Sequence, residues 1–443
     1  MYLPRSSRWS MTRRRKRPNL FSWAILGLVV LFGYYLNQVY LPAQPNPFEA
    51  TPTATRSPES LATEAENLFK EGKLLQSIEA YEEAIKASPQ NPALYLAIAR
   101  IQMWAGQYEE AKANAENAML LNPENSTAYA VHAWALDFLG GEENRGQALD
   151  SIQRAIELDD RNALAHAYYA EILIDTGLFE NYELAAEHSR IALSLDPALL
   201  EARRARGYVL ENISSEDNTN RELAVAEYRA AIEMNPYIPM LHLELGRNLR
   251  ALEVYDEAIR EFNLANTLNP QDPDPDLLIS RTYATIGDYA KAIQYAEQAV
   301  KDRATDPSLR GNWGVMLFRN FLYEPALEQL ERAVKGGTTE DGLPIIGIPL
   351  TEGGRAVEYH YTYGLALART NQCGEALKIS QQIKTAVSTD ENAVFAADEM
   401  VRICEENLAN PPEETPTPAE GEATAEPETE TPAPEATEVT ATP

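Results

Sequence analysis

Residues 239–270 read PMLHLELGRNLRALEVYDEAIREFNLANTLNP, and this stretch decides the fold. Its apolar residues recur at intervals of three and four, which predicts two amphipathic helices joined by a turn. Gly246, Ala258 and Ala265 are small enough to let two helix backbones approach each other closely. Phe262 follows Ala258 by one helical turn, so it lies on the same face and fills the space between the helices. The stretch therefore predicts one helix-turn-helix unit.

The same arrangement of small residues repeats along the chain. Proline or a substitute closes successive units, at intervals of 34 to 39 residues, at Pro89, Pro123, Asp160, Pro197, Pro236, Pro270 and Ala304. The first column of small residues consists of Ala65, Ala99, Ala133, Ala170, Gly207, Gly246, Ser280, Gly314 and Gly364. A second column runs from Ser77 to Ala376, and a third from Ala84 to Ala333. Three columns that hold together predict an array of stacked helix pairs.

This pattern closely resembles the tetratricopeptide repeat (TPR) family, most clearly at Leu245-Gly246, Tyr255, Ala258, Phe262 and Ala265. The resemblance implies an all-α TPR solenoid of about nine helix-turn-helix repeats, wound into a right-handed superhelix. Residues 61–335 would hold repeats 1 to 8, and residues 356–410 the ninth repeat and a capping helix. Residues 336–355 include GLPIIGIPL, which predicts an inserted loop because apolar residues alternate with helix breakers. This loop either folds back over the neighbouring units or stays exposed to dock a partner.

By the same resemblance, the first helix of each unit lines a concave groove that contacts extended peptides or helices. The candidate partner-groove residues are Arg100, Trp134, Tyr208, Arg247, Arg250, Arg281 and Phe318. Arg247, Arg250 and Arg281 would form a basic patch for an acidic segment or a phosphate group, because guanidinium groups pair bidentately with such anions.

Two competing interpretations apply to this groove. The arginines could instead pair within the solenoid, with Glu244, Glu253 and Glu257 as the nearby carboxylates. Trp134, like Trp104, could serve packing rather than partner binding.

An uncharged apolar run covers residues 20–40, directly after the basic block RRRKR at residues 13–17. A helix of this length measures about 30 Å, which is enough to span a hydrocarbon core. The positive-inside rule then predicts a single-pass plasma-membrane protein with residues 1–19 in the cytoplasm and the repeats outside it. Residues 41–60, rich in Pro and Thr, would form a linker. A cleavable signal peptide and a buried soluble helix are the competing interpretations.

The C-terminal residues 411–443 consist of Glu, Pro, Thr and Ala apart from Gly421 and Val439. They contain nine Glu and no basic residue. So few apolar side chains cannot offset the entropy of ordering the chain, which predicts a disordered acidic tail. A glycosylated stalk and a segment that contacts a cell wall are the alternatives.

Cys373 and Cys404 are the only cysteines of the chain. If the helices that carry them turn near residues 388 and 389, antiparallel packing places the two sulfurs opposite each other. We therefore expect a disulfide that locks the C-terminal cap in an oxidising compartment. Two buried free thiols are the alternative.

The formal net charge of −29 argues against a nucleic-acid partner, because binding to phosphates needs clustered Lys and Arg. The chain has no metal-site spacing, phosphate loop or nucleophile motif, so we expect no enzyme activity, no cofactor and no metal. The pattern is typical of a membrane-tethered, bacterial-type TPR scaffold that binds a protein or peptide and assembles complexes. The alternative function is an accessory subunit of cell-envelope polymer synthesis or export, which binds glycan or peptide.

Overall fold

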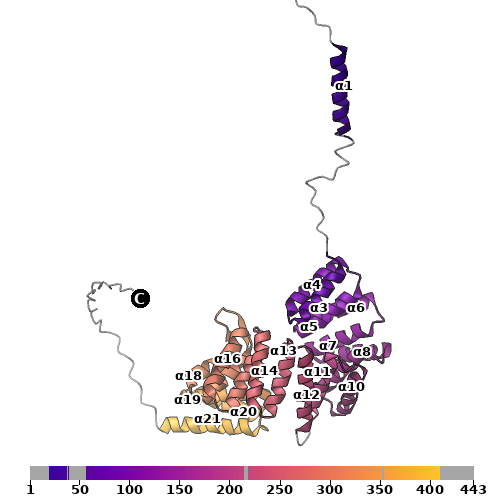
Figure 1. Ribbon diagram of the computed structural model, residues 1–443. Helices are drawn as coiled ribbons and strands as arrows, with labels where there is room; N and C mark the ends of the chain where they lie inside the picture. Colours follow the sequence, from indigo (N-terminus) through magenta and orange to yellow (C-terminus); the bar gives the residue numbers. More distant parts are fainter. Residues whose placement is uncertain (1–18, 37, 39–55, 214–217, 352–353, 410–443) are drawn as a thin grey trace, which may run out of the picture.

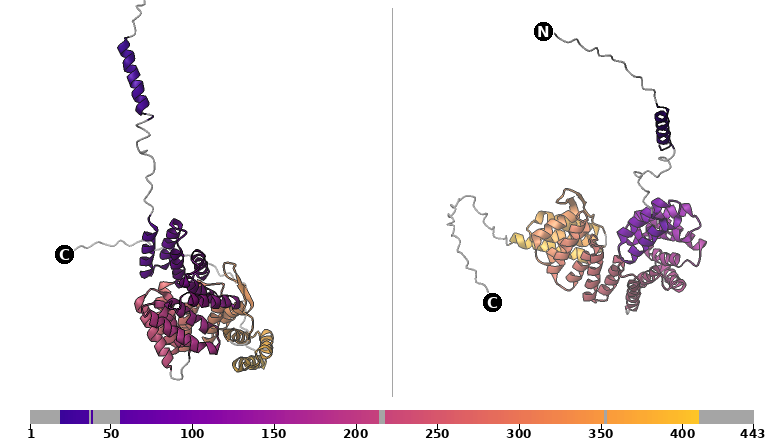
Figure 2. Two further views of the ribbon diagram at one scale, coloured as in Figure 1. Left: turned by 90° about the vertical axis from the view of Figure 1, so that its right-hand side faces the viewer. Right: turned by 45° about the horizontal axis from the view of Figure 1, so that its top comes forward.

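The computed structural model describes residues 19–36, 38, 56–213, 218–351 and 354–409. Helix α1 (Leu20–Tyr35) stands apart from the other elements in both views of Figure 2. The remaining helices pair along the chain and stack into one curved array (Figure 1). This array is the all-α solenoid that the columns of small residues predict.

Each unit consists of a first and a second helix. Units 1 to 4 are α3 (Pro58–Lys70) with α4 (Leu74–Ala87), α5 (Pro92–Trp104) with α6 (Tyr108–Leu121), α7 (Ser126–Leu139) with α8 (Glu142–Leu158), and α9 (Ala163–Asp175) with α10 (Tyr182–Leu195). Units 5 to 8 are α11 (Leu200–Asn212) with α12 (Thr219–Met234), α13 (Pro239–Ala251) with α14 (Tyr255–Leu268), α15 (Asp274–Thr285) with α16 (Tyr289–Asp302), and α17 (Pro307–Arg319) with α18 (Tyr323–Lys335). Unit 9 is α19 (Gly354–Arg369) with α20 (Cys373–Ala386), followed by α21 (Glu391–Ala409). The short 3₁₀ helix η2 (Phe179–Asn181) precedes α10.

The helices begin where the sequence supplies capping side chains. Asn91 Oδ1 accepts a hydrogen bond of 3.1 Å from the backbone N–H of Ala93, and Pro92 occupies the first helical position of α5. Asp306 does the same for Ser308 at the start of α17. These contacts satisfy backbone N–H groups that have no partner inside the helix.

The columns of small residues hold the two helices of each unit together. Ala258 and Ala265 are completely buried, and Gly246 packs directly against the ring of Phe262. A Cβ added to Gly246 would lie 2.5 Å from Phe262 Cε1, closer than any real Cβ contact. The residues at these positions are therefore small because the neighbouring helix leaves no room.

A second repeated contact, which the sequence does not reveal, ties four of the described units to the turn that precedes them. In four units a side chain of the first helix donates a hydrogen bond to the carbonyl six residues earlier: Tyr95 to Pro89, His166 to Asp160, His242 to Pro236, and Arg310 to Ala304. The accepting residues are the ones that close the units. Three quite different donors fill this position, so no single residue type reveals it in the sequence.

The N-terminal units curl back against the middle of the array. Gly72, in the turn between α3 and α4, packs so tightly on Tyr237 that an added Cβ would lie 2.4 Å from the Tyr237 Cβ. Ile238, next to Tyr237, belongs to the same buried cluster as Trp104 and Trp134. The inner face of units 2 to 5 is therefore covered by other parts of the same chain.

The predicted loop at residues 336–355 contains a short β-hairpin, in which β1 (Gly336–Thr338) pairs antiparallel with β2 (Pro344–Ile346). Its chain folds back onto unit 8, because Ile345 is buried and the N–H of Ile348 donates to the carbonyl of Ala333 at 2.9 Å. Ile346, by contrast, is exposed. Residues 352 and 353 lie outside the described residues. Of the two interpretations of this loop, the structure shows the folded-back one for its described part.

The array ends in a disulfide between Cys373, at the start of α20, and Cys404, in α21. The Cα atoms are 5.5 Å apart, and the two residue numbers differ by 31. The covalent bond attaches the last helix to the ninth unit, in the arrangement expected from antiparallel packing. A cross-link of this kind stabilises a fold mainly by restricting the unfolded chain.

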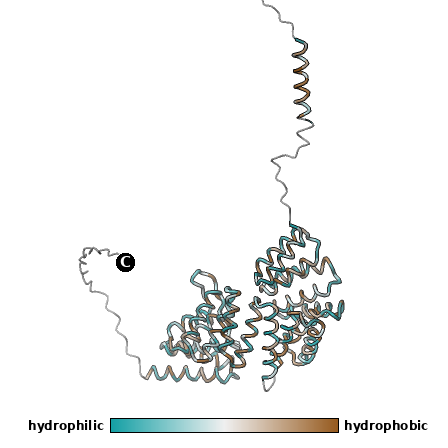
Figure 3. Tube along the Cα trace, in the orientation of Figure 1, coloured by the Kyte–Doolittle hydropathy of each residue, from teal (hydrophilic) through white to brown (hydrophobic). Residues whose placement is uncertain are grey.

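Helix α1 lies within the membrane span predicted at residues 20–40. It covers 16 residues, Leu20–Tyr35. No helix in the described part of the chain is both long and apolar enough to cross a membrane. Most of α1 carries the apolar colour in Figure 3, and its large apolar side chains from Phe21 to Tyr35 are exposed. Residues 37, 39 and 40, and the predicted linker up to residue 55, lie outside the described residues.

Candidate functional site

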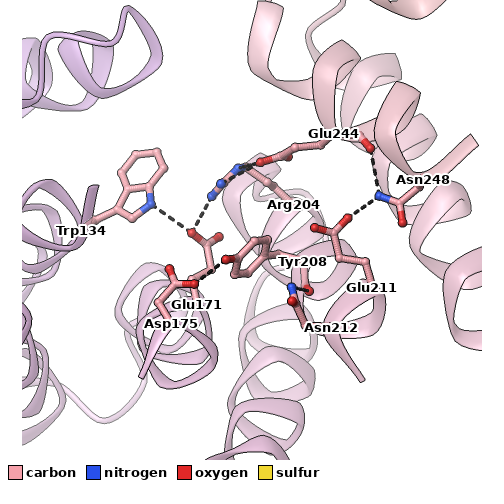
Figure 4. A network of polar contacts seen from close by, with 9 residues as sticks. All are labelled: Trp134, Glu171, Asp175, Arg204, Tyr208, Glu211, Asn212, Glu244 and Asn248. Atoms are coloured by element: carbon pink, nitrogen blue, oxygen red, sulfur yellow. Dashed lines mark hydrogen bonds and ion pairs between the residues drawn. The ribbon is translucent and has the colours of Figure 1, made fainter. Parts of the chain in front are cut away.

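The first helices of the units line the inner face of the array, where the groove is expected. The side chains on this face form two zones with opposite charge. The Arg204 network, which comprises Trp134, Glu171, Arg204 and Glu244, lies on α7, α9, α11 and α13 (Figure 4). The arginine cluster, which comprises Arg247, Arg250, Arg281 and Arg355, lies on α13, α15 and α19.

The Arg204 network is an internal ion-pair network. Arg204 Nη2 lies 2.8 Å from Glu244 Oε1, and Arg204 Nη1 pairs with Glu171 Oε2. The indole N–H of Trp134 donates to the same Glu171 oxygen at 3.0 Å. All these side chains are buried. A charge network so well shielded from water fixes the arrangement of units 3 to 6 relative to one another.

Aromatic rings surround the guanidinium group of Arg204. Its Cζ lies 5.5 Å from the ring centroid of Trp134 and 5.6 Å from that of Phe138. Trp134 also stacks on Tyr168, with ring centroids 4.2 Å apart. The faces of these rings attract the cation, and their bulk excludes water from the network. The aromatic side chains of this zone are thus used for packing.

The network and its surroundings hold more carboxylates than cations, and burial changes their protonation. Burial raises the pKa of Glu171 to about 7, although the Arg204 guanidinium partly offsets this. Burial, followed by repulsion from Glu244, raises the pKa of Glu211 to about 7. Burial, followed by the charge of Asp175, raises the pKa of Asp137 to about 9. A bound proton on such groups reduces the repulsion between them.

Three of the candidate groove residues are engaged inside the molecule. Trp134 is completely buried, so the structure gives it a packing role in place of the predicted partner contact. Arg100 Nη2 pairs with Glu201 Oε1 at 2.6 Å, on the first helix of unit 5. The hydroxyl of Tyr208 donates to Asp175 Oδ1 (Figure 4). The N-terminal half of the predicted groove is thus occupied by the chain's own side chains, since units 1 and 2 fold over it.

The arginine cluster lies in the C-terminal half, where the inner face stays accessible. The Arg247 and Arg355 side chains are 49% and 44% exposed. Burial, followed by the positive charge of Arg355, lowers the pKa of both Arg250 and Arg281. Arg281 Nε donates to the neutral amide oxygen of Asn312 at 3.3 Å. Within the described residues, the Arg250 side chain has no hydrogen bond and no ion pair.

The carboxylates near this cluster only partly neutralise it. Arg247 Nη2 lies 3.4 Å from Asp274 Oδ2, and Arg355 Nη1 donates to Glu358 Oε2 at 2.9 Å. Glu358 also accepts from Arg319, so one carboxylate serves two guanidinium groups. Arg247 also interacts with Glu211, Glu244 and Asp272, so among the described residues the positive charge without a carboxylate partner is that of Arg250 and Arg281.

Three members of the cluster, Arg247, Arg250 and Arg281, were predicted from the repeat pattern, and the fourth, Arg355, was not. The proposed internal partners are used elsewhere: Glu244 pairs with Arg204, and Glu257 pairs with Arg229 at 2.6 Å. Among the described residues, no ion pair joins Glu253 to the cluster. Arg355 is the last residue of the predicted loop 336–355, whereas the structure places it in the first turn of α19, so its position beside the other arginines could not be read without the fold. Phe318, the last candidate, is partly buried and packs against Tyr323, with ring centroids 5.4 Å apart.

A cleft of about 700 Å³ lies where the first two units face units 6 and 7. Its lining includes Gln76, Trp104, Tyr108, Asn269, Asp272 and Arg303. A smaller adjoining pocket of about 230 Å³ shares several of these residues and also includes Arg247. In the described part of the chain, no group of three or more His, Cys, Asp or Glu side chains is placed to hold a metal ion.

The stacked helix pairs and their internal polar network define an all-α repeat protein, and the family follows from the sequence comparison. Tetratricopeptide repeat models match residues 68–135, 213–273 and 277–301. The chain belongs to the tetratricopeptide repeat family, which confirms the resemblance seen in the sequence.

Two curated relatives are similar to part of the chain. The BBSome complex member BBS4 of Bos taurus is 23% identical over 242 residues, which is 55% of this chain and 44% of BBS4. The human Tetratricopeptide repeat protein 13 is 27% identical over 179 residues, which is 39% of this chain and 19% of that protein. The chain thus spans less than half the length of these relatives.

Solved structures share the fold over most of the chain. An IFIT1 monomeric mutant with Gppp-AAAA has a TM-score of 0.52 at 16% identity and covers 87% of both chains. A human IFIT1 dimer with PPP-AAAA has the same TM-score and identity and covers 79% of this chain and 83% of its own. At this level of identity the likeness concerns the fold alone.

Proposed function

We propose that this TPR protein is a protein-interaction scaffold that binds an acidic segment of a partner protein on the arginine cluster. TPR proteins bind protein partners, and the relative BBS4 is named as a member of a complex, which supports a role in assembly.

The observation that carries the proposal is the unpaired positive charge of Arg250 and Arg281. Both guanidinium groups are partly buried, and a third cation, Arg355, lowers their pKa. Bringing like charges together on a surface is unfavourable unless an anion relieves the repulsion. Carboxylates of a bound segment would do so through bidentate, charge-assisted hydrogen bonds.

Two other ligand classes receive less support. A glycan would need aromatic stacking platforms, but Trp134 is buried and Trp104 is nearly so. The IFIT1 structures contain Gppp-AAAA and PPP-AAAA, whereas this chain has a formal net charge of −29, which argues against a nucleic acid. An acidic protein segment is therefore the proposed occupant, and the other two classes are outcomes of the test.

The test is binding of a fluorescein-labelled peptide of alternating Glu and Ser to the full chain in detergent, followed by fluorescence anisotropy. The double variant Arg250→Gln/Arg281→Gln should weaken binding by about tenfold or more, because two charge-assisted contacts are lost. The matched control is Arg154→Gln/Arg190→Gln on the second helices α8 and α10, which should leave the affinity unchanged. Binding of triphosphorylated RNA or of an oligosaccharide, but not of the peptide, would overturn the proposal.

We also propose that the N-terminal segment tethers the scaffold to the plasma membrane with the repeats outside the cytoplasm. The support is the uncharged run at residues 20–40, the basic block before it, and the exposed apolar side chains of α1. A tether would raise the local concentration of the arginine cluster at the membrane surface. Protease added to intact cells should degrade the repeats. Protection of everything after Tyr40 would contradict this placement.

A further inference from the structure

We propose that the acidic segment at residues 411–443 of this same chain occupies the arginine cluster and competes with the partner. This inference rests on the proposed function, because it assigns a second, intramolecular ligand to the same surface. The segment would keep the cluster covered until a partner with more acidic character or a better shape displaces it.

Charge complementarity is the first argument. The cluster is a positive site whose cations Arg250 and Arg281 have no carboxylate partner among the described residues. Residues 411–443 carry nine Glu and no Lys or Arg. No stretch of the repeats combines so many carboxylates with a complete lack of compensating cations. The segment therefore offers the chemistry that the cluster is built to bind.

The second argument is reach. Asn407 Nδ2 donates to the carbonyl of Ala368 at 2.9 Å, so the end of α21 lies beside the C-terminal end of α19. Arg355 lies at the opposite end of α19, and a helix of 16 residues is about 24 Å long. A chain of 33 residues reaches up to about 110 Å when extended. The segment is long enough to reach every arginine of the cluster.

The third argument is that the tether makes a weak contact effective. A segment joined to its own binding surface acts at an effective concentration in the millimolar range. The Pro, Thr and Ala between the glutamates add no large apolar side chain. Binding would thus depend on charge, and salt would weaken it because exposed charges are screened.

The experiment compares the native full chain with a full-chain variant in which the nine Glu of residues 411–443 are changed to Gln. The probe is the labelled Glu-Ser peptide. We expect the variant to bind the probe about tenfold more tightly at about 0.05 M salt, because the competing segment is lost. The difference should vanish at about 0.5 M salt. A tail with the same residues in scrambled order is the matched control and should behave like the native chain.

A second measurement adds the synthetic peptide 411–443 to the Glu→Gln variant. The peptide should bind to the variant and displace the probe. The further substitutions Arg250→Gln/Arg281→Gln should weaken the binding of the peptide. Equal affinity of the native chain and the Glu→Gln variant for the probe, with no binding of peptide 411–443, would overturn the inference and leave the proposed function intact. Binding of peptide 411–443 but not of the probe would support the inference and overturn the proposed partner. Failure of both to bind would overturn both.

Discussion

Arg204 Nη2 on α11 lies 2.8 Å from Glu244 Oε1 on α13, forty residues further along the chain. This buried contact joins unit 5 to unit 6, and the pairing of Arg204 with Glu171 extends it to unit 4. The stability of a solenoid depends on the interfaces between neighbouring units. Here a shared charge network also fixes how successive first helices lie, next to the surface that presents the arginine cluster.

Removal of Arg204 should strongly destabilise the fold. Arg204→Met leaves Glu171 and Glu244 buried without a cation, so we expect a loss of about 3 to 5 kcal/mol in the free energy of unfolding, measured by urea denaturation. The control is Arg154→Met, whose partner Glu157 is exposed, and it should change stability by less than about 1 kcal/mol. Equal effects of the two substitutions would show that the network contributes no more than a surface pair.

Two glycines inside helices should respond in opposite ways to alanine, because Gly246 belongs to the first column of small residues and Gly146 lies outside the columns. Gly246→Ala should cost about 1 to 3 kcal/mol, because the new methyl group would overlap the ring of Phe262. Gly146→Ala in α8 should instead stabilise the protein by about 0.5 to 1 kcal/mol, because no atom lies within 4 Å of the new Cβ and alanine favours helix. The melting temperatures of both variants, measured by thermal denaturation, test whether Gly246 faces the neighbouring helix. A stabilising Gly246→Ala would contradict it.

The contact between Gly72 and Tyr237 should hold the N-terminal units against the middle of the array. Gly72→Ala adds a clash with Tyr237, whereas Gly106→Ala at the matching turn meets no atom within 4 Å. Both glycines have a positive φ, so the backbone strain of the two substitutions is comparable. We expect only Gly72→Ala to enlarge the radius of gyration in small-angle X-ray scattering. Identical scattering of the two variants would mean that the curled arrangement does not need this contact.

His188 should make the fold sensitive to acid. His166 Nε2 donates to the carbonyl of Asp160, and His166 Nδ1 lies 2.7 Å from His188 Nδ1. Burial, followed by the neighbouring His166, lowers the pKa of His188 to about 4, compared with about 6.5 in an unfolded chain. Below pH 6.5 the unfolded state binds more protons, so this contribution to stability is complete above pH 6.5 and disappears as the pH falls toward 4. Denaturation of His188→Gln should show a smaller loss of stability between these pH values than the native protein, and an equal loss would refute the assignment.

Reduction of the disulfide should loosen the end of the array. Opening the Cys373–Cys404 loop, with its separation of 31 residues, should cost about 3 to 4 kcal/mol through the entropy of the unfolded chain. The measurement is the urea midpoint with and without reductant. The variant Cys373→Ser/Cys404→Ser should be insensitive to reductant, and an unchanged native midpoint would count against the bond.

The sequence by itself determined the repeating unit, because helix packing leaves a local record. Gly246, Ala258 and Phe262 contact each other within one unit, so their spacing is visible in a short stretch of chain. The partners of Arg204 could not be read in this way, since Glu171 and Glu244 lie 33 and 40 residues away in sequence. Which part of the inner face is buried depends on how the whole array curves. The curvature of the array is the sum of small rotations between many successive units, so no single unit encodes it. For this reason only the tertiary structure showed that Trp134 lies in the core and that Arg355 belongs to the arginine cluster.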